Sequence, residues 1–294
     1  MTHPMTKCAP LLFITTTLAC HAENASSAPD ADTGVLAEAA SDSSKCDAGV
    51  GSVVSDVPSC VDPANRYLVY LHGSILDGKS ASAPDTWTSG AYGHYDYTDI
   101  LKALASAGFV VISELRASDQ TWTNATSYIT FYAQKAAGQV ATLIAAGVPR
   151  DHIVVAGYSQ GGFIAQVAGT LTNAADVRFA IMAGCAPATK GPSYCEFTGG
   201  TFAGSGSSAT CSYSSPKTSG AATLKGNYLS IFATDDTEGH SCALGFQQAS
   251  EAEGTLFAQA ELILPATGAG HGIFYKVDDS WLGPVTRFAG TGKP

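Results

Sequence analysis

Short runs of apolar residues alternate along the chain with longer stretches in which apolar residues recur every three or four positions. The short runs are rich in valine, isoleucine and aromatic residues, which predicts buried strands. They cover residues 67–73, 109–113, 153–156, 177–183, 228–233 and 261–265. The longer stretches predict helices over 97–107, 125–146, 162–171, 244–258 and 281–288.

This alternation of strands and helices predicts an α/β fold with a mostly parallel central sheet and helices on both faces. We expect a single domain over 66–294, with a long loop over 74–95 and an insertion over 185–224. The insertion is rich in Gly, Ser, Thr and Pro, and we expect it to form part of a lid or pocket wall. Residues 20–45 contain almost no large apolar residue and predict a disordered tether, followed by an N-terminal loop to residue 65.

One strand–helix junction carries a recognisable chemical motif. Gly157-Tyr158-Ser159-Gln160-Gly161 follows the strand at 153–156 directly and precedes the helix at 162–171. A G-x-S-x-G sequence in this setting places its serine on a sharp, strained turn, and the two glycines let strand and helix approach closely. Ser159 is therefore the predicted nucleophile.

Two further strand ends carry suitable partners for a nucleophilic serine. Asp235 and Asp236 follow the strand at 228–233, and His271 follows the strand at 261–265. Parallel strands bring their carboxyl ends to one edge of a sheet, where ligands bind. A serine hydroxyl needs an adjacent base, and that base needs a carboxylate to orient it. We therefore expect His271 as the base and one of the two aspartates as the acid.

An acyl-transfer site also needs two N–H donors for the developing oxyanion. The residue after the nucleophile, Gln160, offers one backbone N–H group. Ser74, which follows His72-Gly73 at another strand end, is the predicted source of the second. We expect His72 to hold this loop through a side-chain hydrogen bond and to take no part in proton transfer.

The segment from residue 67 to about 289 resembles the catalytic domain of the α/β-hydrolase family. Its Ser159 motif is similar to that of carboxylesterases and acyl-protein thioesterases. The fuller pattern resembles a group of exported bacterial α/β-hydrolases, through Leu71-His72-Gly73, Ile112-Ser113-Glu114 and Gly270-His271-Gly272-Ile273-Phe274-Tyr275. Members of the family usually carry the acid three residues beyond the small residue that ends the strand, here Ala233, which favours Asp236 over Asp235. The resemblance implies a serine hydrolase that needs no cofactor or metal.

Other polar and aromatic residues near strand ends have alternative uses. His240, Asp235, Asp236 and Glu238 could ligate a metal, but their spacing fits no defined site and favours a solvated loop. Glu114 and Arg116 could contact substrate, although local ion pairing is the simpler use. Five residues form an aromatic cluster that could line an acyl pocket or pack the loop: Trp87, Tyr92, His94, Tyr95 and Tyr97.

Charge and the first residues bear on partners and location. The net charge of −10 argues against nucleic acids and anionic membrane surfaces as partners. Residues 1–19 combine Lys7 with an uncharged, mainly apolar stretch, which predicts an export signal. Thr17-Leu18-Ala19-Cys20 resembles a lipoprotein signal, so Cys20 could carry a lipid that anchors the protein to a membrane. Cleavage after Ala22 by an ordinary signal peptidase is the alternative.

Cysteine usage agrees with export. Of the eight cysteines, six remain after Cys8 in the signal and Cys20 at the lipid site are set aside. An even number without a C-x-x-C pair predicts disulfides in an exported protein. Proximity along the chain suggests the pairs Cys46–Cys60, Cys195–Cys211 and Cys185–Cys242.

Three candidate functions follow from this sequence. The first is an exported serine hydrolase that cleaves carboxylic esters or thioesters through an acyl-enzyme. The second is a surface or binding lipoprotein that retains the fold without turnover, and an adhesin with metal ligands at 235–240 is a weaker third. The order serine, aspartate, histidine favours the enzyme, because a non-catalytic descendant has no physical need for all three.

Overall fold

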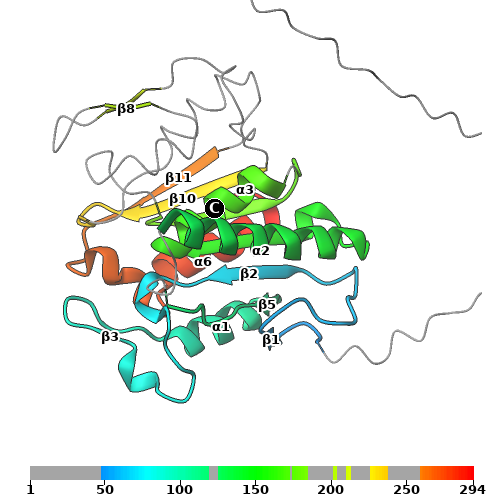
Figure 1. Ribbon diagram of the computed structural model, residues 1–294, viewed down its shortest axis with the longest axis horizontal. Coiled ribbons are helices and arrows are strands. Elements are labelled where there is room, and N and C mark those ends of the chain that lie inside the picture. The colour runs from blue at the N-terminus through cyan, green and yellow to red at the C-terminus, as the bar shows by residue number, and fades with distance from the viewer. Residues whose placement is uncertain are drawn as a thin grey trace, which may run out of the picture. The chain divides into compact units, whose positions relative to one another are not determined.

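The computed structural model describes residues 48–118, 125–172, 174–184, 201–203, 210–212, 226–237 and 259–294 (Figure 1). All of them belong to the second of two units of the chain, Ser43–Pro294. The predicted export signal, Cys20, the tether, the helix at 244–258 and most of the 185–224 insertion lie outside the described residues. Cys60 is disulfide-bonded, but none of the three predicted pairings lies wholly within the described side chains.

Seven described strands form one sheet, in the order β1-β5-β2-β6-β7-β10-β11. Every neighbouring pair in it is parallel. The strands are β1 (Val53–Val54), β2 (Tyr67–Leu71), β5 (Val110–Ile112), β6 (Ile153–Tyr158), β7 (Arg178–Met182), β10 (Asn227–Ala233) and β11 (Gln259–Leu264). The mostly parallel sheet expected from the alternating pattern is therefore confirmed.

Helices cover both faces of this sheet. Along β6, Val154, Ala156 and Tyr158 join one apolar cluster with α1 (Tyr97–Ser106) and α6 (Asp279–Thr291). Ile153 and Val155 join the other, with α2 (Ala125–Ala145) and α3 (Gln160–Thr172). Successive residues of a strand point to opposite faces, so a strand buried on both sides must be apolar throughout. This explains why these strands read as continuous apolar runs.

The strand order reverses its direction between β2 and β6. The chain leaves β2 through α1 towards β5 on one side, and leaves β6 through α3 towards β7 on the other. β2 and β6 are hydrogen-bonded neighbours, with Leu71 opposite Gly157. The segments that follow these two strands therefore begin side by side and lead towards opposite sides of the sheet. Ligands of open α/β sheets bind at such a reversal of strand order.

Several elements differ from the sequence prediction. Residues 46–65 were expected to be loop, yet Val53–Val54 pairs with β5 as an edge strand. The expected loop over 74–95 holds two 3-10 turns, η1 (Ser74–Leu76) and η2 (Pro84–Thr86), and an antiparallel pair. These pieces are two or three residues long, too short to show a periodic pattern.

The remaining described elements complete the chain. The pair within 74–95 consists of β3 (Thr88–Ser89) and β4 (Gly93–His94), and a second antiparallel pair in the insertion consists of β8 (Thr201–Ala203) and β9 (Thr210–Ser212). Two further 3-10 turns are η4 (Arg150–His152) and η7 (Gly270–Tyr275). Within the described ranges, no helix has the length and apolar character needed to cross a membrane.

Candidate active site

Ser159 occupies a strained turn between β6 and α3. Its φ angle is +54°, a left-handed conformation that it shares with Ala183 alone among the described non-glycine residues. Such a conformation costs on the order of 1–3 kcal/mol and persists only where the surroundings enforce it. Here the Ser159 N–H group donates to the Met182 carbonyl (2.9 Å), and its carbonyl accepts from the Phe163 N–H group (3.0 Å).

The two motif glycines are required by close backbone contacts. A Cβ atom at Gly157 would lie 2.1 Å from the Gly161 carbonyl oxygen, and one at Gly161 would lie 2.0 Å from the Leu71 carbonyl oxygen. Neither contact can be relieved by moving a flexible side chain, because both partners are backbone. The turn therefore has the tight strand–helix packing that the motif predicted.

Ser159, His271 and Asp236 form a continuous hydrogen-bonded chain. His271 lies in η7, and its Nε2 atom is 2.9 Å from Ser159 Oγ. Its Nδ1 atom is 2.8 Å from Asp236 Oδ2. A carboxylate can only accept, so Nδ1 carries the proton and Nε2 is left to accept from the serine hydroxyl. The Asp236 side chain is 0% exposed and the His271 side chain 6% exposed, so water competes little for these bonds.

Asp235 has a different set of partners. Its Oδ2 atom accepts from the backbone N–H groups of Thr267 (3.2 Å), Gly268 (2.8 Å) and Gly270 (3.3 Å). These groups belong to the segment that leads into His271. The two aspartates that the sequence left as alternatives are thus separated by geometry: Asp236 contacts the His271 ring, and Asp235 holds the backbone that carries it.

Tyr158 contacts both the backbone and the ring of His271, a role that the sequence did not predict. The Tyr158 hydroxyl donates to the His271 carbonyl at 2.9 Å, and the two rings lie 4.9 Å apart between centroids. Burial raises the pKa of Tyr158 far above its usual range, so its hydroxyl stays protonated and able to donate. The motif position between Gly157 and Ser159 carried no signal for this bond, because its partner lies more than a hundred residues later.

The segment after β2 packs against the Ser159 turn. A Cβ atom built on Gly73 would lie 3.6 Å from Ser159 Cβ, and one on Gly161 would lie 2.4 Å from the His72 carbonyl oxygen. Ser74 begins η1, and Gln160 begins α3. The first N–H groups of a helix have no partner within it. The structure therefore brings the segments of both predicted oxyanion donors, Ser74 and Gln160, beside the nucleophile.

His72 is fully buried and holds the segment after β2. Its Nε2 atom accepts from the Arg116 N–H group at 3.1 Å, so Nδ1 carries the proton and donates to the Gly73 carbonyl at 2.8 Å. Burial, and then the nearby Arg116 guanidinium, lower the pKa of His72 well below its usual range. The contacts agree with the expected role of His72 as a loop-holding residue.

The buried neutral His72 predicts a loss of stability in mild acid. The unfolded chain binds a proton near pH 6.5, whereas folded His72, with its lowered pKa, does not. This residue therefore contributes stability above pH 6.5 that is lost as the pH falls towards its folded pKa, by up to about 1.4 kcal/mol per pH unit. Urea unfolding between pH 7 and pH 5 should show this slope in the wild type and a shallower one in His72→Asn, whose amide can still donate to Gly73. Equal slopes would contradict the assignment.

The other candidate residues from the sequence are mostly structural. Glu114 forms an ion pair with Lys135 (2.6 Å) and Arg116 one with Asp77 (3.0 Å), so both pair as expected, though not with each other. Glu238 and His240 lie outside the described residues. No group of three or more potential metal ligands occurs among those that the structure describes.

The aromatic cluster divides into a packed part and a part near the site. Trp87, Tyr95 and Tyr97 are buried in the core, where the Tyr95 hydroxyl lies 2.7 Å from that of Tyr70. Tyr92 is only half-buried and its ring lies 5.8 Å from that of His271. His94 lies in β4, with its Nδ1 atom 3.3 Å from Thr88 Oγ1. Tyr92 is therefore the member of this cluster whose ring lies beside His271.

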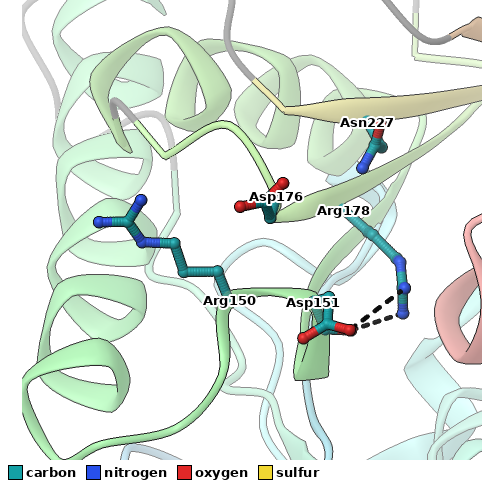
Figure 2. A pocket seen from close by; sticks show the side chains of 5 residues that line it. All are labelled: Arg150, Asp151, Asp176, Arg178 and Asn227. Atoms are coloured by element: carbon teal, nitrogen blue, oxygen red, sulfur yellow. Dashed lines mark hydrogen bonds and ion pairs between the residues drawn. The ribbon is translucent and has the colours of Figure 1, made fainter.

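An open hollow of about 410 Å³ lies at the opposite edge of the sheet. Its lining comes from the amino ends of β6, β7 and β10: Arg150, Asp151, Asp176, Arg178 and Asn227. Figure 2 shows Arg178 reaching back to Asp151, while Arg150 points away from that pair. The Arg178 Nη1 atom also donates to the Asp151 and Ala289 carbonyls. Two arginines balance two aspartates here, and the guanidinium ties η4 to the end of α6.

Several solved structures are similar to this protein, whereas no sequence family matches it. No protein-family model matches the sequence, and no curated protein matches it. An esterase from Pyrobaculum calidifontis is 16% identical over 80% of this chain and 78% of its own, with a TM-score of 0.47. SOBER1 from Arabidopsis thaliana is 14% identical over 77% and 98%, with a TM-score of 0.46. Esterase B from Lactobacillus rhamnosis is 15% identical over 79% and 78%, with a TM-score of 0.45. The parallel sheet and the strand–turn–helix unit at Ser159 give this chain the α/β-hydrolase fold.

Proposed function

We propose that this protein is an exported serine hydrolase that cleaves carboxylic esters through an acyl-enzyme on Ser159. The observation that carries the proposal is the chain of hydrogen bonds from Ser159 Oγ through His271 to Asp236, at 2.9 and 2.8 Å. Its outer member is a buried carboxylate, which stabilises the imidazolium that forms when His271 takes a proton.

The geometry supports a two-step reaction. His271 Nε2 removes the hydroxyl proton as Ser159 Oγ attacks the ester carbonyl carbon, and the carbonyl oxygen becomes an oxyanion. The backbone N–H groups of Gln160 and Ser74 bind that oxyanion. The intermediate then expels the alcohol, which receives the proton from His271, and leaves an acyl group on Ser159. In the second step His271 takes a proton from a water molecule as the water oxygen attacks the acyl carbon. The bond from that carbon to Ser159 Oγ then breaks, Oγ receives the proton from His271, and the acid is released.

Thioesters and location complete the proposal. A thioester would follow the same course with a thiol as leaving group, so it belongs to the same proposal. Export follows from the signal-like residues 1–19, and lipid attachment at Cys20 would be the link to a membrane. We propose a small or polymeric ester as the partner and no nucleic acid, as the net charge of −10 indicates.

A series of p-nitrophenyl esters from acetate to octanoate tests the function. We expect a burst of p-nitrophenol equal to the enzyme concentration if deacylation is slower than acylation, and a chain-length optimum that reports the acyl pocket. Ser159→Ala should remove the burst. Ser106→Ala is the matched control, because Ser106 is exposed at the end of α1 and should keep it.

Two results would contradict this function. A burst that persists in Ser159→Ala would place the chemistry elsewhere. A wild-type protein that hydrolyses none of the esters, with thioesters included, would favour the surface or binding lipoprotein.

A further inference from the structure

Arg116 is a buried cation that the proposed reaction does not use. It follows β5, is 2% exposed, and lies at the same edge of the sheet as Ser159. Its strand neighbours β2, and β2 in turn neighbours β6. To reach the Ser159 turn, the Arg116 side chain must cross the carboxyl end of β2.

The guanidinium joins the two segments that carry the proposed oxyanion donors. Arg116 Nη2 donates to the His72 carbonyl at 2.6 Å and to Gln160 Oε1 at 3.3 Å. His72 precedes Gly73-Ser74, and Gln160 is the residue after the nucleophile. One nitrogen atom therefore bridges the segment after β2 and the first residue of α3.

Further contacts fix the guanidinium itself. Arg116 Nε donates to Asp77 Oδ1 (3.2 Å) and to the Tyr128 hydroxyl (3.1 Å), and Nη2 lies 3.0 Å from Asp77 Oδ1. Asp77 follows η1 directly, so its carboxylate holds the other end of the turn that Ser74 begins. The Arg116 backbone also donates to His72 and accepts from the Gly78 N–H group.

The buried contacts of Arg116 affect the placement of the oxyanion donors as well as the stability of the fold. A buried ion pair contributes little net stability compared with apolar residues of similar size, but removing one partner leaves an uncompensated charge. Oxyanion stabilisation depends on donors held in place before the reaction, and a displacement of about 1 Å can cost on the order of 100-fold in rate.

We propose that Arg116 is a positioning residue, which sets the distance between the Ser74 and Gln160 backbone N–H groups by bridging the His72 carbonyl and the Gln160 side chain. The inference rests on the proposed function, because the donors matter only if an oxyanion forms. The planar guanidinium group, with its several N–H donors, makes arginine suited to this task, whereas a lysine ammonium would reach fewer of the same acceptors.

Arg178 provides a matched control for Arg116. It is also a buried arginine, paired with Asp151 (Figure 2) and with two backbone carbonyls, but it begins β7 and so lies at the amino ends of the strands, opposite Ser159. Replacing either arginine by methionine should lower the thermal midpoint. Only the Arg116 substitution should alter catalysis in the molecules that remain folded.

The test measures acylation per active site, with burst amplitude as the count of active sites. In the full chain, Arg116→Met should lower the acylation rate constant about 100-fold with KM changed less than about threefold. Affinity for an alkyl trifluoromethyl ketone, which forms a tetrahedral adduct with the serine, should fall by a similar factor. Arg116→Lys should recover about tenfold, and Arg178→Met should match the wild type per active site.

Two outcomes would overturn the inference, and both differ from failure of the proposed function. Arg116→Met with the same per-site rate constant and ketone affinity as Arg178→Met would show a purely structural arginine. Unchanged amide hydrogen exchange over residues 72–78 in Arg116→Met would overturn the positioning role without any activity measurement. A wild-type protein that hydrolyses none of the esters or thioesters would instead overturn the function itself.

Discussion

Ser159→Ala and His271→Ala should each lower kcat for p-nitrophenyl acetate by about 10⁵–10⁶-fold, and the double variant should be no worse than either single one. The two side chains act as one unit, since His271 Nε2 lies 2.9 Å from Ser159 Oγ and the base is useless without the hydroxyl. Residual hydrolysis would come from the oxyanion donors and from binding alone. Steady-state kinetics on the three variants, with active-site titration of the wild type, measures the effect.

Additive losses in the double variant would contradict this account. They would show that Ser159 and His271 act in separate events, as a structural serine and an unrelated base would. Ser159→Ala should unfold near the wild-type midpoint, whereas the two variants that lack His271 should unfold at a lower temperature, because they remove a partner of the buried Asp236 carboxylate. Thermal midpoints and a far-UV spectrum at the assay temperature therefore separate a loss of chemistry from a loss of fold.

Asp236→Asn should lower kcat by about 10⁴-fold, and Asp235→Asn by much less. An asparagine at 236 can donate to Nδ1 of His271, which would move the imidazole proton to Nε2, where it blocks removal of the serine proton. At 235, one side-chain oxygen remains to accept from the Thr267, Gly268 and Gly270 N–H groups. The main cost there is stability, about 1–3 kcal/mol for a perturbed set of charge-assisted bonds.

Asp235→Asn is the matched control for Asp236→Asn, because the same substitution is made at adjacent positions. The measurements are kcat/KM for the preferred ester and the free energy of unfolding in urea. Equal losses of kcat/KM at both positions would contradict the assignment of Asp236 as the acid. Such equal losses would instead indicate that any change in the turn at 235–236 displaces His271.

The local parts of the fold and site were open to prediction from the sequence. The helices α1 and α2 ended within one residue of their predicted bounds, because each has an apolar face of clear period and a glycine-containing stop. The Ser159 turn was predictable because its requirements, two glycines between strand and helix, lie within five residues. Asp236 needed the family resemblance, since nothing local distinguishes it from Asp235.

Features that depend on distant contacts were not open to prediction in this way. The Tyr158 hydroxyl bonds to the His271 carbonyl, and Arg116 bonds to His72 and Gln160. Each partner lies between 44 and 113 positions away in the sequence, so no spacing rule connects them. The edge strand at Val53–Val54 is defined only by its pairing with β5, and two apolar residues carry no period of their own.

Labelling with a fluorophosphonate, followed by mass spectrometry of the modified peptide, tests the central claim most directly. The reagent reacts with an activated serine and needs no knowledge of the natural ester. We predict one label per chain, on Ser159, that is lost in His271→Ala and kept in Ser106→Ala. An unlabelled wild-type protein, or a label on any other residue, would contradict an acyl-enzyme at Ser159.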